Sequence, residues 1–462
     1  DLHEVAPAEV GEVDLYQRRE KIYTRKLEGF FQRVRLYTGW PLLLGFFLLP
    51  WTNWDGRQSV LFDLPERKFH ILGLTFWPQD FPMLAFLLII AAFALFAVTT
   101  FAGRIWCGYT CPQTVWTSIF MWIEQRFEGS RNQRIKLDTA PWSAEKVMRK
   151  GLKHGGWLFV GFLTGMTFVG YFYPIRELWW ELLTFSTGQW QFLWTLFFTC
   201  ATYINAGWLR EQVCMYMCPY ARFQSVMFDR DTLIVSYDMK RGEPRGSRKR
   251  SADLAEISLG ACVDCELCIQ VCPTGIDIRD GLQYECIGCA LCVDACDSVM
   301  DKMNYPRGLI RYTSESELDG GHTHWARPRI IGYVLVLCLM VGVFWYHMFS
   351  RIPLELTIIR DRSQLYVTTD SGAVENIYTL QLVNMDPDMH EFKISISGIE
   401  GAQIVGDTLY TLDGGEVRSI SLRVRAEPEV LNKSSSEFDF SAVATDRSDL
   451  MIVHESRFLK PL

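Results

Sequence analysis

Eight cysteines in a short stretch constrain this chain more than any other feature of its sequence. They form two quartets with the same C-x2-C-x2-C-x3-C spacing, the second displaced by 24 residues: Cys262, Cys265, Cys268, Cys272, then Cys286, Cys289, Cys292, Cys296. This spacing is typical of bacterial two-cluster ferredoxins, in which thiolates hold [4Fe–4S] clusters. We therefore predict an α+β ferredoxin-like insert at 253–305 with two [4Fe–4S] clusters, in a chain that moves electrons one at a time.

The crossed ligand rule of such ferredoxins assigns each cysteine to a cluster, because the fourth cysteine of each quartet reaches across to the partner cluster. The first cluster then takes Cys262, Cys265, Cys268 and Cys296. The second cluster takes Cys286, Cys289, Cys292 and Cys272.

Zinc and disulfides explain the pattern less well. Structural zinc sites usually show two C-x2-C knuckles, without a third cysteine followed by x3-C. Adjacent thiols at this spacing cannot all form disulfides without strain. Pro273 completes the C-P ending of the ferredoxin run, and Gly275 and Gly288 supply tight backbone near the clusters. Asp297 follows Cys296 in place of a second proline, which leaves the ligands intact.

Five apolar stretches are candidates to cross a bilayer, which needs roughly 20 mostly apolar residues. They lie at 37–54, 82–102, 156–173, 190–208 and 329–348. Lys and Arg are concentrated in 1–36, in 103–155 and in 209–328, and the positive-inside rule places such segments in the cytoplasm. We therefore expect a multi-pass membrane protein with an α-helical bundle of about five spans. Its N-terminal segment and ferredoxin insert would be cytoplasmic, and its C-terminal part periplasmic.

The domain order follows from these assignments. Residues 37–238 form a four-span region, and 239–252 form a basic linker, expected to be flexible, solvated and attracted to anionic headgroups. A connector at 306–328 leads from the ferredoxin insert to the fifth span. Short alternating strands separated by turn residues predict an all-β, immunoglobulin-like sandwich at 352–462. The net charge of −7 gives no indication of nucleic-acid binding.

Two further cysteine pairs share a C-x3-C-P motif: Cys107 with Cys111, and Cys214 with Cys218. Each motif follows the cytoplasmic end of an even-numbered span, so the two span pairs resemble a duplicated hairpin that delivers the same motif to one membrane face. If the helix continues, the i, i+4 spacing points both sulfurs of a pair to one side. The proline after each pair would end that turn or begin a new helix.

Four thiols gathered in this way could bind one of several metals or pack as structural residues. Soft sulfur ligands select Cu(I), zinc or an iron–sulfur cluster over hard cations, and the thioethers of Met215 and Met217 favour cuprous copper. The alternative is that these are buried structural cysteines, because free Cys packs as a small hydrophobe. No nucleotide-binding motif is present, so the electrons come from another protein or from a quinol. The electron donor itself is not identified by the sequence.

With these motifs in order, the chain resembles the CcoG (FixG/RdxA) family of cytochrome c oxidase accessory proteins. The matching features are the five spans, WCGYTCP, VCMYMCPY, the paired ferredoxin quartets and the C-terminal immunoglobulin-like domain. The resemblance implies a cupric reductase of the bacterial inner membrane, which reduces Cu(II) to Cu(I) for assembly of the cbb-type oxidase. It makes Cys107, Cys111, Cys214 and Cys218 the candidate copper-binding residues. A copper exporter, a chaperone or oxidase assembly factors would receive the cuprous ion.

Two other functions stay open. Subunits of the NapH type share the C-x3-C-P and ferredoxin motifs, so the chain could oxidise quinol and feed a periplasmic reductase. A third hypothesis is a non-catalytic scaffold for oxidase assembly, whose clusters are structural or sense redox state. The sequence also leaves open whether the two C-x3-C-P motifs meet within one chain or across a homodimer.

Overall fold

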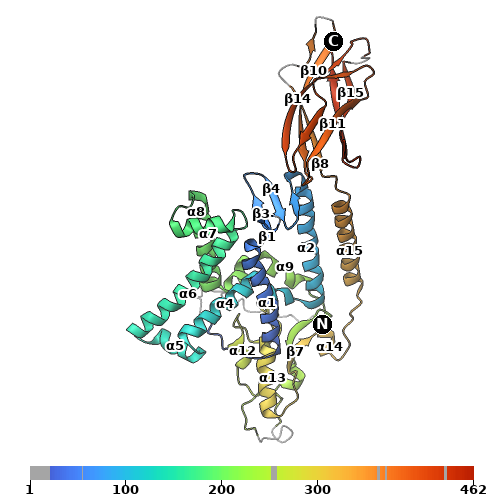
Figure 1. Ribbon diagram of the computed structural model, residues 1–462. Helices are drawn as coiled ribbons and strands as arrows, with labels where there is room; N and C mark the ends of the chain where they lie inside the picture. Colours follow the sequence, from blue (N-terminus) through green and yellow to red (C-terminus); the bar gives the residue numbers. More distant parts are fainter. Residues whose placement is uncertain are drawn as a thin grey trace, which may run out of the picture. The chain divides into compact units, whose positions relative to one another are not determined.

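The computed structural model describes residues 21–54, 56–250, 258–361, 365–369, 372–430 and 434–461 (Figure 1). The chain divides into two compact units, each taken by itself below. The first unit comprises the residues up to Phe76 together with Leu84–Leu339. The second unit comprises Trp77–Met83 and the chain from Met340 onward.

Helices dominate the first part of the chain. In order they are α1 (Phe30–Leu48), α2 (Phe81–Ala102), α3 (Ile105–Tyr109), α4 (Pro112–Glu128), α5 (Arg131–Thr139), α6 (Ala144–Val169), α7 (Ile175–Thr184) and α8 (Gln189–Thr202). Two π-helical turns, η3 (Tyr203–Leu209) and η4 (Val213–Met217), lead from α8 to α9 (Pro219–Met227). Short strands lie between α1 and α2: β1 (Asn53–Trp54), β2 (Arg57–Gln58), β3 (Val60–Asp63), β4 (Lys68–Ile71) and β5 (Leu74–Phe76).

Two helices in the described residues are long and apolar enough to cross a membrane, Pro78–Ala102 and Pro328–Phe349. They correspond to the expected second and fifth spans. The other three expected spans are largely helical, in α1, in α6 and in α8 with η3, but none of them combines the length and the hydropathy of those two. The bundle of five spans therefore stays a prediction.

Helix α6, which contains most of the expected third span, is apolar over only part of its length. Its first half carries Lys146 and Lys153, both buried, and only its second half is apolar. That half packs closely on α8, where a Cβ on Gly165 would lie 2.6 Å from the carbonyl oxygen of Thr195. Small residues allow such close approach of two helix backbones.

The ferredoxin insert begins and ends at a two-stranded antiparallel ribbon. Strand β6 (Ile234–Tyr237) pairs with β7 (Ile310–Thr313), so the two ends of the insert lie side by side. Between them lie α10 (Met239–Gly242), α12 (Leu267–Val271), η5 (Ile278–Asp280) and α13 (Leu291–Met303), and α14 (Glu315–Leu318) follows β7. The start of the expected insert, 253–257, lies outside the described residues.

The basic segment 239–252 differs from the expected flexible linker. Asp238 caps α10, and the Arg241 guanidinium donates to the carbonyl oxygens of Pro306 and Arg307. Backbone hydrogen bonds also join Gly242 to Cys262, with a nitrogen–oxygen distance of 3.3 Å. The expectation of a flexible connector is therefore wrong for this folded part of the segment. Residues 251 and 252 lie outside the described residues.

The second unit contains α15 (Pro328–Phe349) in part and a β-sandwich. One sheet has the order β12-β14-β10-β8, with β9 paired to β10, and the other has the order β13-β11-β15-β16. Their bounds are β8 (Leu354–Arg360), β9 (Val367–Thr368), β10 (Val374–Asn384), β11 (His390–Ser397), β12 (Gln403–Val405), β13 (Leu409–Leu412), β14 (Val417–Ala426), β15 (Ser435–Ala444) and β16 (Met451–Leu459).

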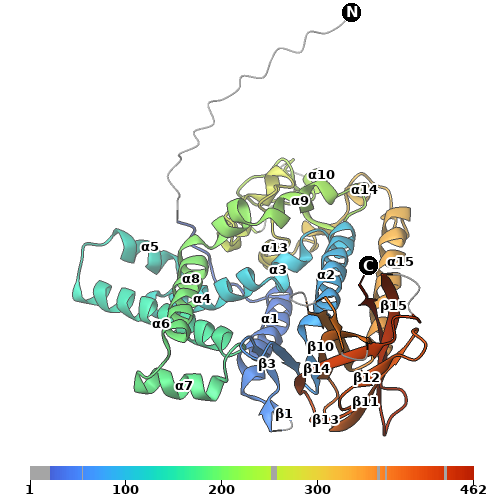
Figure 2. The same ribbon diagram turned by 90° about the horizontal axis from the view of Figure 1, so that it is seen from above.

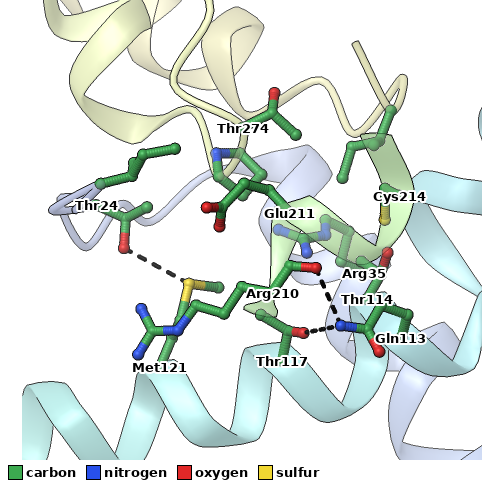
Figure 3. Close-up of a pocket in the computed structure, with 13 residues that line it drawn as sticks. Thr24, Arg35, Gln113, Thr114, Thr117, Met121, Arg210, Glu211, Cys214 and Thr274 are labelled. Atoms are coloured by element: carbon green, nitrogen blue, oxygen red, sulfur yellow. Dashed lines mark hydrogen bonds between the residues drawn. The ribbon is translucent and has the colours of Figure 1, made fainter. Parts of the chain in front are cut away.

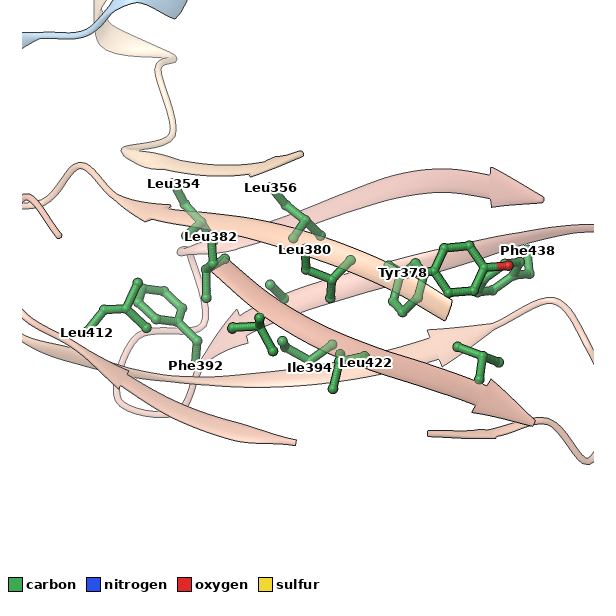
Figure 4. Close-up of a cluster of buried hydrophobic side chains, with 14 of the residues drawn as sticks. Leu354, Leu356, Tyr378, Leu380, Leu382, Phe392, Ile394, Leu412, Leu422 and Phe438 are labelled. Atoms are coloured by element: carbon green, nitrogen blue, oxygen red, sulfur yellow. The ribbon is translucent and has the colours of Figure 1, made fainter. Parts of the chain in front are cut away.

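The sandwich has a core built from both sheets (Figure 4). Alternate residues of β10, among them Tyr378, Leu380 and Leu382, are fully buried. This follows because successive side chains of a strand point to opposite faces, and one face of β10 is directed into the core. They meet Phe392 and Phe440 of the facing sheet. The core therefore lies between the two sheets.

Candidate functional site

The internal repeat of the cysteine quartets is also a repeat of backbone conformation. Asp264 and Gly288 occupy equivalent places and both have positive φ, at 51° and 64°. Glu266 and Ala290 are the next equivalent pair, with φ of 55° and 56°, and they begin α12 and α13. Alternating left- and right-handed residues turn successive backbone N–H groups into a concave nest that binds anions and iron–sulfur clusters.

The first cavity of the insert is lined by the cysteines that the crossed rule groups together: Cys262, Cys265, Cys268 and Cys296. The side chains of Tyr237, Arg279 and Met300 line it as well. Burial, followed by its neighbours Cys268, Cys262 and Cys265, raises the pKa of Cys296 to about 12. Cys296, the fourth cysteine of the second quartet, thus lies among the first three cysteines of the first quartet.

A second cavity holds the other set, Cys272, Cys286, Cys289 and Cys292, and Cys268 also reaches its wall. Val235, Ile276 and Ile278 supply apolar lining. Burial raises the pKa of Cys286 to about 12, and it also raises the pKa values of Cys289 and Cys292. A buried thiolate needs a positive partner, and a bound metal deprotonates a coordinating thiol outright. Two nests, each beside a cavity lined by four cysteines, therefore fit two [4Fe–4S] clusters.

The structure explains why Asp297 follows Cys296. Helix α13 continues through this position to Met303, so a proline there would remove an N–H inside the helix. The Asp297 carboxylate instead accepts a hydrogen bond from the Gly308 backbone N–H at 2.9 Å. The first quartet differs because α12 ends at Val271, immediately before Cys272 and Pro273.

Both C-x3-C-P motifs end in the same way. Cys111 and Cys218 are each the cap residue of a helix, and Pro112 and Pro219 are the first residues of α4 and α9. The sequence allowed these prolines either to end a turn or to begin a new helix. In the structure they begin a new helix, where the missing backbone N–H costs nothing. The partner cysteines lie one turn earlier, Cys107 in α3 and Cys214 in η4.

Hydrogen bonds tie the two motifs together within one chain. The Cys107 thiol donates to the Gln224 side-chain oxygen on α9, with a distance of 3.4 Å. Buried Arg104, which precedes α3, donates to the carbonyl oxygen of Ala221 on the same helix. On the other side, the Gln113 amide of α4 donates to the Arg210 carbonyl oxygen at 3.1 Å.

The four thiols of these motifs are electrostatic neighbours. Burial, followed by Cys111, Cys107 and Cys218, raises the pKa of Cys214 to about 12. Burial and then Cys111 raise the pKa of Cys107 to about 11. We call Cys107, Cys111, Cys214 and Cys218 the membrane-side quartet. No second copy of the chain is needed to assemble it.

The membrane-side quartet lies directly against the second ferredoxin cavity. A Cβ on Gly108 would lie 2.8 Å from the Cys289 Cα, so the two backbones are in contact. Cys107 packs with Cys289, Ile287 and Leu291 in one apolar cluster. Figure 2 shows α3 and α13 near each other in the first unit.

Three polar groups lie at this contact, and none was singled out from the sequence. Arg104 also donates to the carbonyl oxygens of Tyr284 and Cys286. The Arg35 Nε–H donates to the Gly108 carbonyl oxygen at 3.1 Å. The Tyr312 hydroxyl donates to the Gly288 carbonyl oxygen. Charged residues beside apolar segments were the available signal for the two arginines, but their partners are far away in sequence.

A pocket opens beside Cys214 (Figure 3). It is lined by Arg35, Arg210, Glu211 and Met121, and Pro273 and Thr274 of the second ferredoxin site reach it. Met215 and Met217, expected to join the metal site, are not among its lining residues. Met217 is largely exposed, and no described contact places its sulfur at the membrane-side quartet.

A buried charge network supports the quartet from the other side of α4. Glu124 is completely buried, and its carboxylate contacts Arg210 at 2.8 Å, Arg134 at 3.4 Å and Lys21 at 3.5 Å. Burial alone would raise the pKa of Glu124, but the three cations outweigh it and hold the pKa at about 2. Glu128 contacts Lys153 at 2.9 Å nearby. The sequence suggested only a basic cytoplasmic loop here.

These features define a class of protein: an iron–sulfur redox protein with a C-terminal β-sandwich and two helices apolar enough to span a membrane. Three family models match it. Residues 209–315 match a 4Fe-4S dicluster domain, and residues 84–129 match a 4Fe-4S binding domain. Residues 344–461 match the IG-like fold at the C-terminus of FixG.

The chain belongs to the FixG/RdxA family. It is 37% identical to the nitrogen fixation protein FixG of Rhizobium meliloti over 94% of this chain and 91% of FixG. It is 38% identical to protein RdxA of Cereibacter sphaeroides over 84% of each chain. A solved FixG-related protein from Vibrio parahaemolyticus is 29% identical, covering 24% of this chain and 98% of that one, with a TM-score of 0.22.

The comparisons confirm three expectations: the family, the iron–sulfur domains and the immunoglobulin-like sandwich. Copper chemistry, membrane topology and partners stay predictions.

Proposed function

We propose that this protein is an oxidoreductase of the bacterial inner membrane that reduces Cu(II) to Cu(I) for assembly of a cbb-type cytochrome c oxidase. Copper is the substrate. The observation that carries the proposal is the contact between Gly108 and Cys289, which puts the membrane-side quartet beside the second ferredoxin site. The quartet is sulfur-rich and partly buried. Soft ligands stabilise Cu(I) more than Cu(II).

The chemistry requires one electron for each copper ion. Iron–sulfur clusters, when bound by the two ferredoxin quartets, supply one-electron storage at potentials set by charge, hydrogen bonds and exposure. The chain's own residues then do three things. Arg104 bonds the quartet segment to the ferredoxin insert, and Arg35 holds the Gly108 carbonyl. Gly108 permits backbone contact, and the thiols hold copper. The electron originates from a one-electron donor or a quinol outside this chain.

In the cell we expect the N-terminal segment and the ferredoxin insert on the cytoplasmic side and the sandwich on the periplasmic side. Support comes from the distribution of Lys and Arg and from the two apolar helices, α2 and α15. The cuprous product would pass to a copper exporter, a chaperone or oxidase assembly factors.

Anaerobic mixing of the reduced protein with Cu(II) tests this function. We expect Cu(I), measured with a cuprous chelator, to form as the absorbance of the reduced clusters changes. The variant Cys214→Ala with Cys218→Ala should lose most of this activity. The matched control is Cys200→Ala with Cys338→Ala, which removes two exposed cysteines away from the site. Equal Cu(I) formation by both variants would rule out the quartet as the copper site.

One observation favours the runner-up function, oxidation of quinol to feed a periplasmic reductase. The pocket beside Cys214 presents Arg35, Arg210 and Glu211 next to the second ferredoxin site, and such polar groups hold small ligands in otherwise apolar pockets. Reduction of the clusters in membranes on addition of quinol alone would support this function. In that case the reaction with Cu(II) should be slow.

A further inference from the structure

Helix α1 begins at a position where its own sequence supplies no cap. Its N-cap residue is Gly29, which has no side chain to accept a hydrogen bond, and its first turn contains no acidic residue. The start of a helix carries unsatisfied N–H groups and a partial positive charge, so it needs an acceptor from water or from another part of the chain. Here the acceptor comes from the ferredoxin insert.

Asp294 of α13 is that acceptor. Its carboxylate accepts a hydrogen bond from the backbone N–H of Phe31 at 3.2 Å and from that of Gln32 at 2.9 Å. These are the second and third residues of α1, whose N–H groups a local N-cap side chain ordinarily satisfies. Asp294 is buried, and 262 positions separate it from Gln32, so the cap is a tertiary contact. Figure 1 shows α13 next to α1.

Gly29 leaves the space that the Asp294 carboxylate occupies. A Cβ on Gly29 would collide with the carboxyl carbon and with the Cβ of Asp294. Beside it, the ring of Phe31 packs edge-on against the ring of Tyr312, with centroids 5.5 Å apart. The Tyr312 hydroxyl in turn donates to the Gly288 carbonyl oxygen. The first turn of α1 therefore fits the ferredoxin insert in shape as well as in hydrogen bonding.

The same helix also contacts the first C-x3-C-P motif. The Arg35 Nε–H donates to the Gly108 carbonyl oxygen at 3.1 Å, and the Thr38 hydroxyl oxygen lies 3.2 Å from the Tyr109 carbonyl oxygen. Gly108 and Tyr109 lie between the two cysteines of that motif. Asp294 lies between the last two cysteines of the second ferredoxin quartet. One helix therefore bonds to the middle of both cysteine runs.

We propose that Asp294 is a positioning residue for electron transfer: it docks the ferredoxin insert on α1 and so fixes the distance between the second [4Fe–4S] cluster and the membrane-side quartet. The inference rests on the proposed function, because in this step Cu(II) gains one electron and the reduced cluster loses one. Asp294 is not among the residues that line the two cluster cavities, so it acts through α1. A misplacement of about 1 Å can cost about 100-fold in rate.

Variants of the full-length protein separate position from charge. Asp294→Ala removes both hydrogen bonds, whereas Asp294→Asn removes the charge and keeps an oxygen acceptor, and Asn caps helices about as well as Asp. Gly29→Ala keeps Asp294 but puts a Cβ where its carboxylate lies. The matched control is Asp301→Ala, which removes an exposed carboxylate of the same helix that pairs with Arg307 at 2.7 Å.

Each protein is reduced with dithionite, freed of excess reductant and mixed in a stopped-flow instrument with Cu(II) or with ferricytochrome c. Ferricytochrome c is too large to enter the quartet and takes electrons at the surface of the insert. We expect Asp294→Ala and Gly29→Ala to form Cu(I) up to about 100-fold more slowly. Their iron content, EPR spectra and rate with ferricytochrome c should equal those of the wild type. Asp294→Asn and Asp301→Ala should form Cu(I) at the wild-type rate.

Hydrogen exchange gives a measurement that does not depend on copper. In Asp294→Ala and Gly29→Ala, the backbone amides around Phe31 should exchange faster than in the wild type, whereas those of β6 and β7 should not change. Unchanged exchange around Phe31 would overturn the docking role. This holds even if the wild type reduces ferricytochrome c and forms no Cu(I), a result that would contradict the cupric reductase.

The rates decide the positioning role. Wild-type Cu(I) formation by a folded, iron-loaded Asp294→Ala would overturn it. Equally slow Asp294→Asn and Asp294→Ala would overturn it as well, because the charge and not the position would then matter. If Asp294→Ala loses iron, Gly29→Ala decides the question, because that variant leaves every residue of the insert unchanged.

Discussion

Gly108 and Cys289 lie backbone against backbone, so closely that a Cβ on Gly108 would be 2.8 Å from the Cys289 Cα and 2.9 Å from the Gly288 carbonyl oxygen. Gly108 belongs to the first C-x3-C-P motif, and Cys289 belongs to the second ferredoxin quartet. The contact therefore brings the backbone of the first C-x3-C-P motif directly against that of the second ferredoxin quartet.

Replacing Gly108 by Ala should force these two sites apart. The added Cβ meets backbone atoms that cannot rotate away, and overpacking of this kind costs about 1–3 kcal/mol. We expect Cu(I) formation to slow while the iron content stays at the wild-type value. Stopped-flow absorbance of the reduced protein after mixing with Cu(II) measures this rate.

Gly151→Ala is the matched control. Gly151 lies in α6, and a Cβ there would meet nothing within 4 Å. Ala is a better helix former than Gly, so the variant should be as stable as the wild type or more stable. An unaltered rate in Gly108→Ala would show that the backbone contact is not the route of the electron.

Glu124 should make the protein sensitive to acid. Its pKa is lowered from 4.5 to about 2, so its stabilising effect is fully present above pH 4.5 and is lost as the pH falls toward 2. Removing one partner of a buried ion pair costs about 3–5 kcal/mol. Glu124→Gln should therefore lower the free energy of unfolding at pH 7 and flatten its dependence between pH 5 and pH 2.

Thermal unfolding in detergent as a function of pH measures this effect. The control is Glu145→Gln, because Glu145 is exposed and pairs with Arg149 at 2.8 Å on the helix surface. Such pairs contribute about 0–1 kcal/mol. Equal unfolding curves for the two variants at neutral pH would contradict the role given to Glu124.

The crossed ligand sets predict that two serine substitutions perturb different clusters. Cys272 lies with Cys286, Cys289 and Cys292, and Cys296 lies with the first quartet. Cys272→Ser should therefore perturb the second cluster, and Cys296→Ser the first. Distinct changes in the EPR spectra of the reduced variants would separate the two clusters. Loss of the same signal in both variants would disagree with the crossed arrangement.

The cysteine spacing was enough to predict this ligand grouping, because in two-cluster ferredoxins of this spacing the fourth cysteine of each run binds the other cluster. The contact between Gly108 and Cys289 could not be predicted, because 181 positions separate them and only tertiary packing brings them together. The ion pairs of Glu124 were missed for the same reason. Its partners Lys21, Arg134 and Arg210 come from three separate segments of the chain.

The core of the sandwich should tolerate truncation poorly. Phe440 is fully buried between the two sheets and stacks edge-on against Tyr378, with ring centroids 5.3 Å apart. Phe440→Ala should lower the stability of this domain by about 3–5 kcal/mol. Val453→Ala, at a half-exposed position of β16, should change it little. Calorimetry of the intact protein measures both, and similar losses would contradict the assigned core.

Seven strands of the sandwich were visible in the sequence because their residues alternate between apolar and polar. Strand β16 was not, because it lies at the edge of its sheet and buries only Phe458. The short strand β12 was missed too, since three residues carry no clear period. The basic segment after Asp238 appeared flexible because its order depends on backbone partners in 260–262 and 306–307.

The number of cuprous ions formed for each electron lost by the clusters is the most direct measurement of the proposed function. Reduced wild-type protein, freed of excess reductant, is titrated anaerobically with Cu(II) while cluster absorbance and chelated Cu(I) are followed together. We expect one Cu(I) for each electron removed. Cluster oxidation without Cu(I), or Cu(II) left unreduced beside reduced clusters, would contradict it.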